Sequence, residues 1–188
     1  MLQEQFNKGE SIIMYKDILT PITDEVIDTL KAGDFVYITG TIYTARDAAH
    51  ARLYTTIQNK ESIPFKLANN IIYYLGPTPA RPGQVIGSAG PTTSSRMDKY
   101  TPLLLEQGMK GMIGKGKRSK EVIEAMVKSH SVYFAAIGGA GALLSKCIKE
   151  AEVIAYDDLG TEAIRKLKVE RLPVIVAIDC NGNNMYVR

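Results

Sequence analysis

Short apolar runs alternate along this chain with longer stretches of helix-favouring residues. The apolar runs are rich in β-branched and aromatic residues, which is typical of strands that are covered on both faces. Strands that alternate with short helices form α/β domains around a parallel sheet. We therefore predict an α/β fold with a largely parallel central sheet. The expected strands are residues 35–39, 71–75, 84–89, 132–137, 152–156 and 172–179, with a final hairpin through 181–182 back to 185–187.

Helix start and stop signals lie between these runs. Thr23 is a candidate N-cap for a helix with acidic residues in its first turn, and Gly33 is expected to end that helix. The strand at 35–39 is expected to end at Gly40, after which Thr44 is a candidate N-cap for an alanine-rich helix. The other helices are expected at 97–107, at 119–129, at 161–168 and from 138–144 onward, in addition to the one at 45–58.

The composition indicates one globular domain. The 188 residues, of which 45% are hydrophobic and 23% charged, suffice for a full core, and we assign 16–188 to the domain and 1–15 to an N-terminal arm. The net charge of +3 is small and the basic residues are interleaved with acidic ones, so nucleic acid is not an expected partner. The most apolar run, 131–145, is too short to cross a bilayer, and the first residues contain no signal-peptide core, so no membrane partner is expected.

The thiol content is low. Cys147 and Cys180 are the two cysteines and they stand far apart in the sequence. This usage favours a reduced, cytoplasmic setting. Two cysteines and two histidines cannot alone supply a usual zinc site or an iron–sulfur cage, so no metal site is expected on this chain.

The stretch 87–99 is the strongest candidate for chemistry. Glycines and a proline bend the backbone, four consecutive hydroxyl residues follow, and Arg96 comes just inside the expected helix, where free N–H groups favour an anion. An arginine fork can grip a carboxylate bidentately while Thr92 and Thr93 offer further donors. The same residues also fit a serine and threonine N-cap beside a solvated arginine, and this stretch alone does not separate the two interpretations.

A second arginine stands at another predicted junction between a strand and a helix. Arg46 lies in the expected first turn of helix 45–58. If the two strands are parallel neighbours, Arg46 and Arg96 project from the carboxyl edge of one sheet, where open α/β sheets bind ligands. Two arginines at one pocket would suit a substrate with two carboxylates. His50 is expected to pack on its helix rather than to act on a ligand.

Two glycine-rich segments admit a nucleotide-binding interpretation. Gly111 to Lys117 has the spacing of a phosphate-binding P-loop, but Arg118 replaces the residue that would hold magnesium and no long apolar strand precedes it. Lys115 either offers a third cation to the sheet edge or belongs to a basic turn before helix 119–129. In 138–144, Gly139 and Gly141 match half of a dinucleotide fingerprint, and close packing of a helix on a strand is the favoured explanation.

Three ordered blocks carry a resemblance to a known family. Residues 40–50 read GTIYTARDAAH, residues 87–98 read GSAGPTTSSRMD, and residues 112–116 read MIGKG. Together they resemble the β subunit, or C-terminal domain, of the iron–sulfur class I fumarases and the related L(+)-tartrate dehydratases. The resemblance covers roughly Lys16 to the end and implies the swivelling β/β/α fold. Ser95 departs from the pattern, since relatives often have glycine there.

The resemblance implies a hydro-lyase subunit that takes part in the reversible hydration of fumarate to malate. By position, Arg46, Arg96 and Lys115 match the carboxylate-binding cations of the family, and Thr92 matches a threonine near the carbon-bound proton, with Thr93 as its neighbour. The family's [4Fe–4S] cluster is bound by a separate α subunit, so this chain would contact the C4 dicarboxylate but hold no metal and would be inactive alone. A threonine hydroxyl is a poor base, so Thr92 is expected to need a group from the partner.

Other functions remain open at this point. L(+)-tartrate is also a small dicarboxylate, so the three cations Arg46, Arg96 and Lys115 would suit it as well as they suit fumarate. A non-enzymatic module that binds a nucleotide or another small anion through 111–117 and 138–144 is the alternative from a different class. Self-association of the isolated chain is compatible with either.

Overall fold

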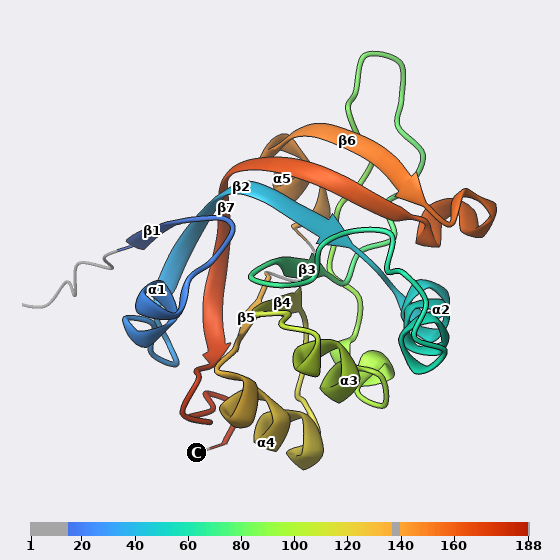
Figure 1. Cartoon of the computed structure of the whole chain (residues 1–188). Coiled ribbons are helices and arrows are strands. Elements are labelled where there is room, and N and C mark those ends of the chain that lie inside the picture. The colour runs from blue at the N-terminus through green and yellow to red at the C-terminus, as the bar shows by residue number, and fades with distance from the viewer. Residues whose placement is uncertain (1–14, 137–139, 188) are drawn as a thin grey trace, which may run out of the picture.

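The computed structural model describes residues 15–136 and 140–187 (Figure 1). All but the last residue of the expected arm at 1–15, and the glycines of the fingerprint at 138 and 139, lie outside this part of the chain. The strands are β1 (Tyr15–Leu19), β2 (Phe35–Thr44), β3 (Ile71–Tyr73), β4 (Gly111–Gly114), β5 (Val132–Ala135), β6 (Ile148–Ala155) and β7 (Ile164–Ile178). The helices are α1 (Asp24–Asp28), α2 (Asp47–Gln58), α3 (Thr101–Glu106), α4 (Lys120–Ser129) and α5 (Gly141–Lys146), with 3-10 turns η1 (Ser94–Met97) and η2 (Asp157–Glu162).

The strands form one sheet that is mostly parallel and that closes on itself. Strands β1 to β5 pair as parallel neighbours in chain order. Strand β7 runs antiparallel to both β5 and β2 and so closes the sheet between these two strands, while β6, among the described strands, pairs with β7 alone. The predicted α/β class with a largely parallel sheet is confirmed. The closure by a long antiparallel strand was not foreseen.

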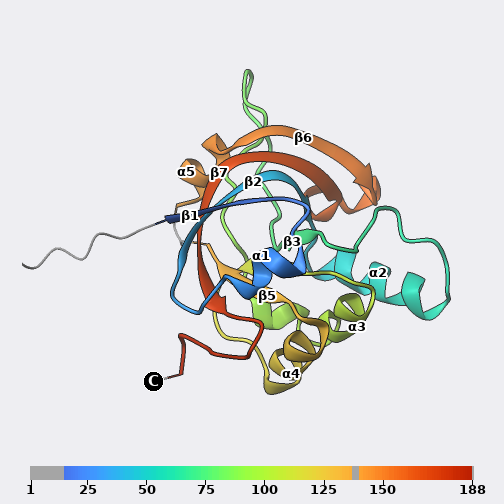
Figure 2. The same ribbon diagram turned by 60° about the vertical axis from the view of Figure 1, so that its left-hand side comes forward.

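The core has two parts because successive residues of a strand point to opposite faces. Ile71 and Tyr73 of β3 belong to the part enclosed by the curved sheet, together with residues of β2, β5 and β7. Ile72 belongs to the second part, which lies between the sheet and the helices α2, α3 and α4. Figures 1 and 2 show these three helices together on one side of the sheet. Within the described ranges, no helix is both long and apolar enough to cross a membrane.

Several predicted elements are confirmed. Helix α4 begins directly after Ser119, whose side chain accepts a hydrogen bond from the Val122 N–H and caps the helix. Strands β3 and β5 overlap the predicted runs, and β6 contains most of another. Helix α1 follows Thr23 but is shorter than expected, since it ends at Asp28 rather than near Gly33.

The helix predicted at 161–168 is wrong. Residues 164–168 begin β7, which continues as one strand to Ile178. Ile164 and Leu167 are both buried, which matches helical spacing, but Leu167 and Val169 also follow the period of a strand. The strand conformation of this half of β7 is stabilised by strand neighbours on both sides, because it pairs with β2 and with β6.

The strand predicted at 84–89 is also wrong, because the structure has an irregular loop there. Ile86 and Ala89 are buried in the core, which accounts for the apolar pattern without a sheet partner. The Ser88 N–H donates to Thr78 Oγ1 at 2.8 Å, and this hydrogen bond joins the two ends of the loop between Thr78 and Ser88. This loop projects beyond β6 in both views (Figures 1 and 2).

Three further boundaries differ from the prediction. Strand β2 does not end at Gly40 but passes through a bulge between Ile38 and Gly40 and reaches Thr44. As a result α2 begins at Asp47, and Arg46 rather than Thr44 is its N-cap residue. The helix expected at 97–107 begins later, as α3 at Thr101, and the 3-10 turn η1 precedes it. The first four residues of the P-loop candidate Gly111 to Lys117 form the buried strand β4, and the basic residues after it lie in the connection to α4.

Candidate functional site

The carboxyl ends of β2, β3 and β4 meet at one edge of the sheet. Thr44 pairs with Tyr73 and Tyr73 pairs with Ile113, so the three strands end at the same level. Arg46 follows β2 and Lys115 follows β4. The hydroxyl-rich segment returns to the same edge, where the Thr92 N–H donates to the Tyr74 carbonyl at 2.8 Å, one residue beyond β3. The topology therefore brings the three candidate segments side by side.

Arg46 lies across the backbone that follows β3. A methyl group added at Gly76 would stand 2.7 Å from both Cδ and Nη1 of Arg46, so the absence of a side chain there makes room for the guanidinium. Arg46 Nη2 lies 3.6 Å from Glu162 Oε1 and 3.8 Å from Asp47 Oδ2. Its Nε is buried and has no hydrogen-bond partner among the described residues. Arg46 is thus held in place with donor capacity to spare.

Asp47 connects the two candidate arginines. Its Oδ1 accepts a hydrogen bond of 2.7 Å from Arg96 Nε, while its buried Oδ2 faces Arg46 without a hydrogen bond. The Arg96 side chain is 51% exposed and uses one of its N–H groups on this contact. Since the guanidinium has five N–H donors, both arginines keep donors for a ligand. Sequence reasoning passed over Asp47, although its place next to Arg46 was visible.

Lys115 and the two threonines form a second contact at this edge. Thr93 and Lys115 pair as a parallel bridge, and the Lys115 N–H donates to the Thr92 carbonyl at 3.3 Å. Thr93 and Lys115 are exposed and Thr92 is partly exposed. In the ranges 15–136 and 140–187, no carboxylate lies within ion-pair distance of Lys115 Nζ. The edge therefore carries net positive charge and faces outward.

A buried ion pair fixes the loops that carry these residues. Arg118 Nε donates to Asp98 Oδ1 at 2.7 Å, and the Arg118 side chain is fully buried between Tyr74 and Tyr133. Asp98 Oδ2 also accepts from the Ser119 N–H at 2.8 Å. The pair ties the turn after Arg96 to the segment after Lys115. Sequence reasoning saw Arg118 only as a departure from a P-loop and did not find this role.

His50 supports the site without facing it. It is completely buried, and burial lowers the pKa of its imidazole from 6.5 to about 4, so the ring is neutral near pH 7. Its Nδ1 lies 2.9 Å from the Arg46 carbonyl, an acceptor, and therefore carries the proton that it donates. The expectation that His50 packs on its helix is confirmed, and it also holds the backbone of the N-cap residue.

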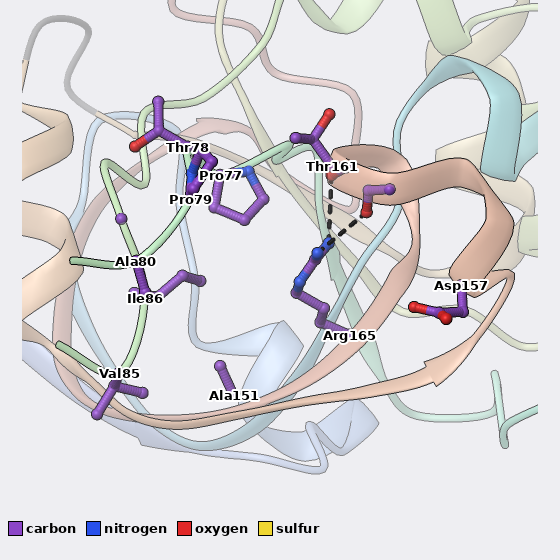
Figure 3. Close-up of a pocket in the computed structure, with 12 residues that line it drawn as sticks. Pro77, Thr78, Pro79, Ala80, Val85, Ile86, Ala151, Asp157, Thr161 and Arg165 are labelled. Atoms are coloured by element: carbon purple, nitrogen blue, oxygen red, sulfur yellow. Dashed lines mark hydrogen bonds between the residues drawn. The ribbon is translucent and has the colours of Figure 1, made fainter. Parts of the chain in front are cut away.

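A cleft of about 390 Å³ lies outside this edge. It is lined by residues 77–80 on one side and by Arg165 on the other, and contains none of the candidate cations or threonines (Figure 3). Arg165 donates to the carbonyls of Gly160 at 3.0 Å and Thr161 at 3.2 Å. Its donors therefore stabilise η2, the turn that carries Glu162 toward Arg46. We assign the cleft no part in the site.

The donor set on this chain does not fit an iron–sulfur cluster. Such clusters are held by several cysteine thiolates, and the chain has two cysteines. The one group of three potential metal ligands in the described part of the chain includes Cys180 but not Cys147. No step of a mechanism can therefore be routed through a cluster on these residues.

The segment considered as a P-loop does not form a phosphate-binding loop. Gly111 to Gly114 form β4, whose backbone pairs with β3 and β5 and is buried, so this segment cannot wrap a phosphate. Gly141 approaches Gly90, since an added methyl group would stand 2.9 Å from the Gly90 nitrogen. Close packing explains this glycine, as expected, although α5 packs on the loop at 88–90 rather than on a strand.

The fold and the site define a class: an α/β domain whose closed, mostly parallel sheet carries cations at one edge. The model of the Fumarase C-terminus family matches residues 3–188, and the chain belongs to that family. The resemblance expected from the three motif blocks is confirmed.

Relatives of this chain are named as enzymes or as enzyme subunits. Fumarate hydratase 2 of Leishmania major is 39% identical over 175 residues, which are 90% of this chain and 31% of that protein. The anaerobic class I fumarate hydratase of Escherichia coli K12 is 38% identical over 97% of this chain and 34% of its own length. The L(+)-tartrate dehydratase subunit beta of the same organism is 34% identical over 92% of this chain and 87% of its own length. The chain thus spans about a third of the fumarate hydratases that it matches.

Proposed function

We propose that this chain is the cation-bearing part of a hydro-lyase active site that hydrates fumarate to malate reversibly. The observation that carries the proposal is the coupling of Arg46 and Arg96 through Asp47 at the sheet edge where Lys115 also emerges. Two guanidiniums and an ammonium suit a substrate with two carboxylates. The names of the fumarate hydratase relatives support this substrate class.

The cations have a direct role in the chemistry. Removal of a proton next to a carboxylate moves negative charge onto that carboxylate. Donors aimed at its oxygens then stabilise the transition state more than the ground state. Arg46 and Arg96 retain free N–H groups for this purpose, and Lys115 has no carboxylate partner in the described ranges that would compete with the substrate.

Thr92 is the proposed residue next to the reacting carbon, with Thr93 as a neighbouring donor. Its backbone is fixed by bonds to Tyr74 and Lys115, which orients the side chain at the end of β3. No side-chain hydrogen bond to Thr92 Oγ1 occurs among the described residues, and no histidine or carboxylate is bonded to it. A threonine hydroxyl moves a proton only with an acid–base partner, so we infer that another polypeptide supplies that group.

We propose that the [4Fe–4S] cluster of the enzyme is also bound by a partner. The family resemblance implies the cluster, and this chain lacks the thiolates for it, so we propose an α subunit that binds the cluster and docks on the outward-facing edge. The tartrate dehydratase relative is named as a β subunit, which supports an enzyme that has a further subunit. We also propose that the fold is the swivelling β/β/α domain that the family resemblance implies.

L(+)-tartrate is the second candidate substrate. The observation that favours it is the similarity to the L(+)-tartrate dehydratase subunit beta of Escherichia coli, which is 34% identical over 177 residues. Arg46, Arg96 and Lys115 would bind either dicarboxylate. Substrate preference would then depend on groups that contact the extra hydroxyl.

The experiment is anaerobic co-purification with a cysteine-bearing partner, followed by assays on fumarate, malate and L-tartrate. We expect no turnover by this chain alone and turnover by the complex. In the complex, Arg96→Lys is expected to lower kcat/KM about a hundredfold through loss of the bidentate fork. Arg52→Lys is the matched control, since Arg52 pairs with exposed Asp158 away from the edge. Turnover by the chain alone, or equal effects of the two variants, would contradict the proposal.

A further inference from the structure

Three metal-ligating side chains meet at the opposite end of the sheet from the proposed site. Asp28 is the last residue of α1, His130 follows α4, and Cys180 follows β7. Their ligand atoms all lie within 4.8 Å of one another. The ends of α1, α4 and β7 come together in the lower left of Figure 1. The three residues are far apart in sequence, so the fold alone assembles them.

The spacing of the three atoms is close to that of a tetrahedral ion. Zinc bonds of about 2.0 Å to nitrogen or oxygen and about 2.3 Å to sulfur place tetrahedral ligands roughly 3.3–3.8 Å apart. His130 Nε2 and Asp28 Oδ1 are already 3.1 Å apart. The remaining distances between ligand atoms, at up to 4.8 Å, need to shorten by about 1 Å through rotation of the exposed Asp28 and the partly exposed His130 side chains.

The surroundings leave these donors available. Cys180 is buried, with 4% of its surface exposed, whereas Asp28 is exposed and His130 is partly exposed. A bound ion would therefore have the thiolate on its buried side and one coordination position open to water on its exposed side. The neighbouring carboxylate of Asp179 is not available, because its two oxygens accept hydrogen bonds from the backbone of Ala32 and from Asn183.

His130 is also held in an unusual backbone conformation. It is the C-cap residue of α4 with φ at 51°, a left-handed position that glycine or asparagine usually occupies. Lys110 Nζ donates to its carbonyl at 3.3 Å and so fixes the turn. The contact between His130 and Asp28 accounts for the proximity of these two side chains. It does not account for the position of the Cys180 thiol next to them.

We propose that Asp28, His130 and Cys180 form a binding site for Zn²⁺ or a similar borderline-soft divalent cation. A mixed sulfur, nitrogen and oxygen set selects this class over Mg²⁺ or Ca²⁺, which take oxygen ligands. On binding, the thiol proton is released to solvent, the Zn–S bond forms, and water completes the fourth position. The ion links α1, the junction of α4 and β5, and the C-terminal turn. This site is independent of the proposed hydro-lyase function.

Sequence reasoning missed the site for a definite reason. Two cysteines and two histidines were judged too few for a usual zinc site, and only one of each takes part. The third ligand is an aspartate from α1, which no spacing rule connects to the other two.

The test uses the full chain after treatment with a chelator, titrated with CoCl₂ as a spectroscopic probe and with ZnCl₂ as competitor. We expect one equivalent of Co²⁺ to give thiolate charge-transfer absorption that Zn²⁺ abolishes, and Zn²⁺ to raise the melting temperature. The absorption should be lost in Cys180→Ser and retained in Cys147→Ser, the matched control. Removal of the exposed carboxylate in Asp28→Asn, which should not disturb folding, is expected to weaken Co²⁺ binding about tenfold or more. Absence of the absorption in the unaltered chain, or its persistence in Cys180→Ser, would overturn the proposal.

Discussion

At the scale of single residues, Asp47 determines the orientation of the Arg46 and Arg96 side chains. It accepts a short bond from Arg96 and lies 3.8 Å from a nitrogen of Arg46, so one carboxylate orients both cations. Glu162 adds a second contact to Arg46 and also accepts from the Ala48 N–H at 2.8 Å, at the first turn of α2. In the proposed function, the two arginines would be positioned before the substrate arrives, which would reduce the entropy lost on binding.

Asp47→Asn tests this positioning role. The amide keeps the shape but removes the charge that holds the two guanidiniums, so we expect KM for the dicarboxylate to rise about tenfold, or about 1.4 kcal/mol, in the assembled enzyme. Asp158→Asn is the control, because it removes the partner of Arg52 at the exposed side of the same helix. Steady-state kinetics of both variants decide the question. An unchanged KM in Asp47→Asn would show that the arginines do not need their carboxylate.

His50 makes stability depend on pH with a definite sign. The folded state keeps the pKa of His50 near 4, whereas the unfolded chain binds a proton at about 6.5. The contribution of neutral, buried His50 to the free energy of unfolding is complete above pH 6.5. It is lost as the pH falls from there toward 4, and the total loss is about 3 kcal/mol. We expect urea unfolding between pH 7 and pH 4 to show a smaller loss of stability in His50→Gln than in the unaltered chain. Parallel profiles for the two proteins would contradict this assignment.

At the scale of elements, local patterns predicted the helices and strands that carry a strong signal in their own residues. Helix α4 has a capping serine and a clear amphipathic period, and β5 is a continuous apolar run. The segments 84–89 and 161–168 failed because tertiary contacts decide their conformation. An irregular loop can bury Ile86 as well as a strand can, and the first half of β7 is a strand because β2 and β6 flank it.

The candidate site could be predicted in part for the same reason. The rule that parallel strands end at one edge led to the expectation that Arg46 and Arg96 lie near one another, but the strand assumed before Arg96 does not form. Arg96 comes to the edge because the Thr92 N–H donates to the Tyr74 carbonyl, and Lys115 comes there because it follows β4, a strand that was not predicted. The residues that hold them are joined by contacts over long sequence separations. Asp47 reaches Arg96 across 49 positions and Asp98 reaches Arg118 across 20, and neither contact has a sequence signature.

Asp98→Asn tests the element that carries the site. Removing one partner of a buried ion pair leaves the other charge uncompensated, so we expect a loss of about 3–5 kcal/mol in the free energy of unfolding. Glu124→Gln is the matched control, because it breaks the exposed pair with Lys120 on α4 and should cost no more than about 0.5 kcal/mol. Denaturant unfolding measures both. Similar costs for the two variants would mean that the Arg118 pair does not organise the loops.

At the scale of the whole molecule, the same unit occurs in two settings. It matches nearly a full tartrate dehydratase β subunit, and it matches about a third of longer fumarate hydratases. A domain used both ways needs a face that meets the remaining part of the enzyme. The edge with Arg96, Thr93 and Lys115 is exposed in this chain, and we propose it as that face.

The most direct test of this proposal is a crystal structure of the assembled complex with succinate, a dicarboxylate that cannot be hydrated. We expect succinate to bind at the end of β2, β3 and β4. Its carboxylates should accept hydrogen bonds of about 2.7–2.9 Å from Arg46 and Arg96, with Lys115 Nζ at the same ligand. Succinate bound elsewhere, with Arg96 paired to Asp47 alone and Lys115 in solvent, would contradict the proposed role of this chain.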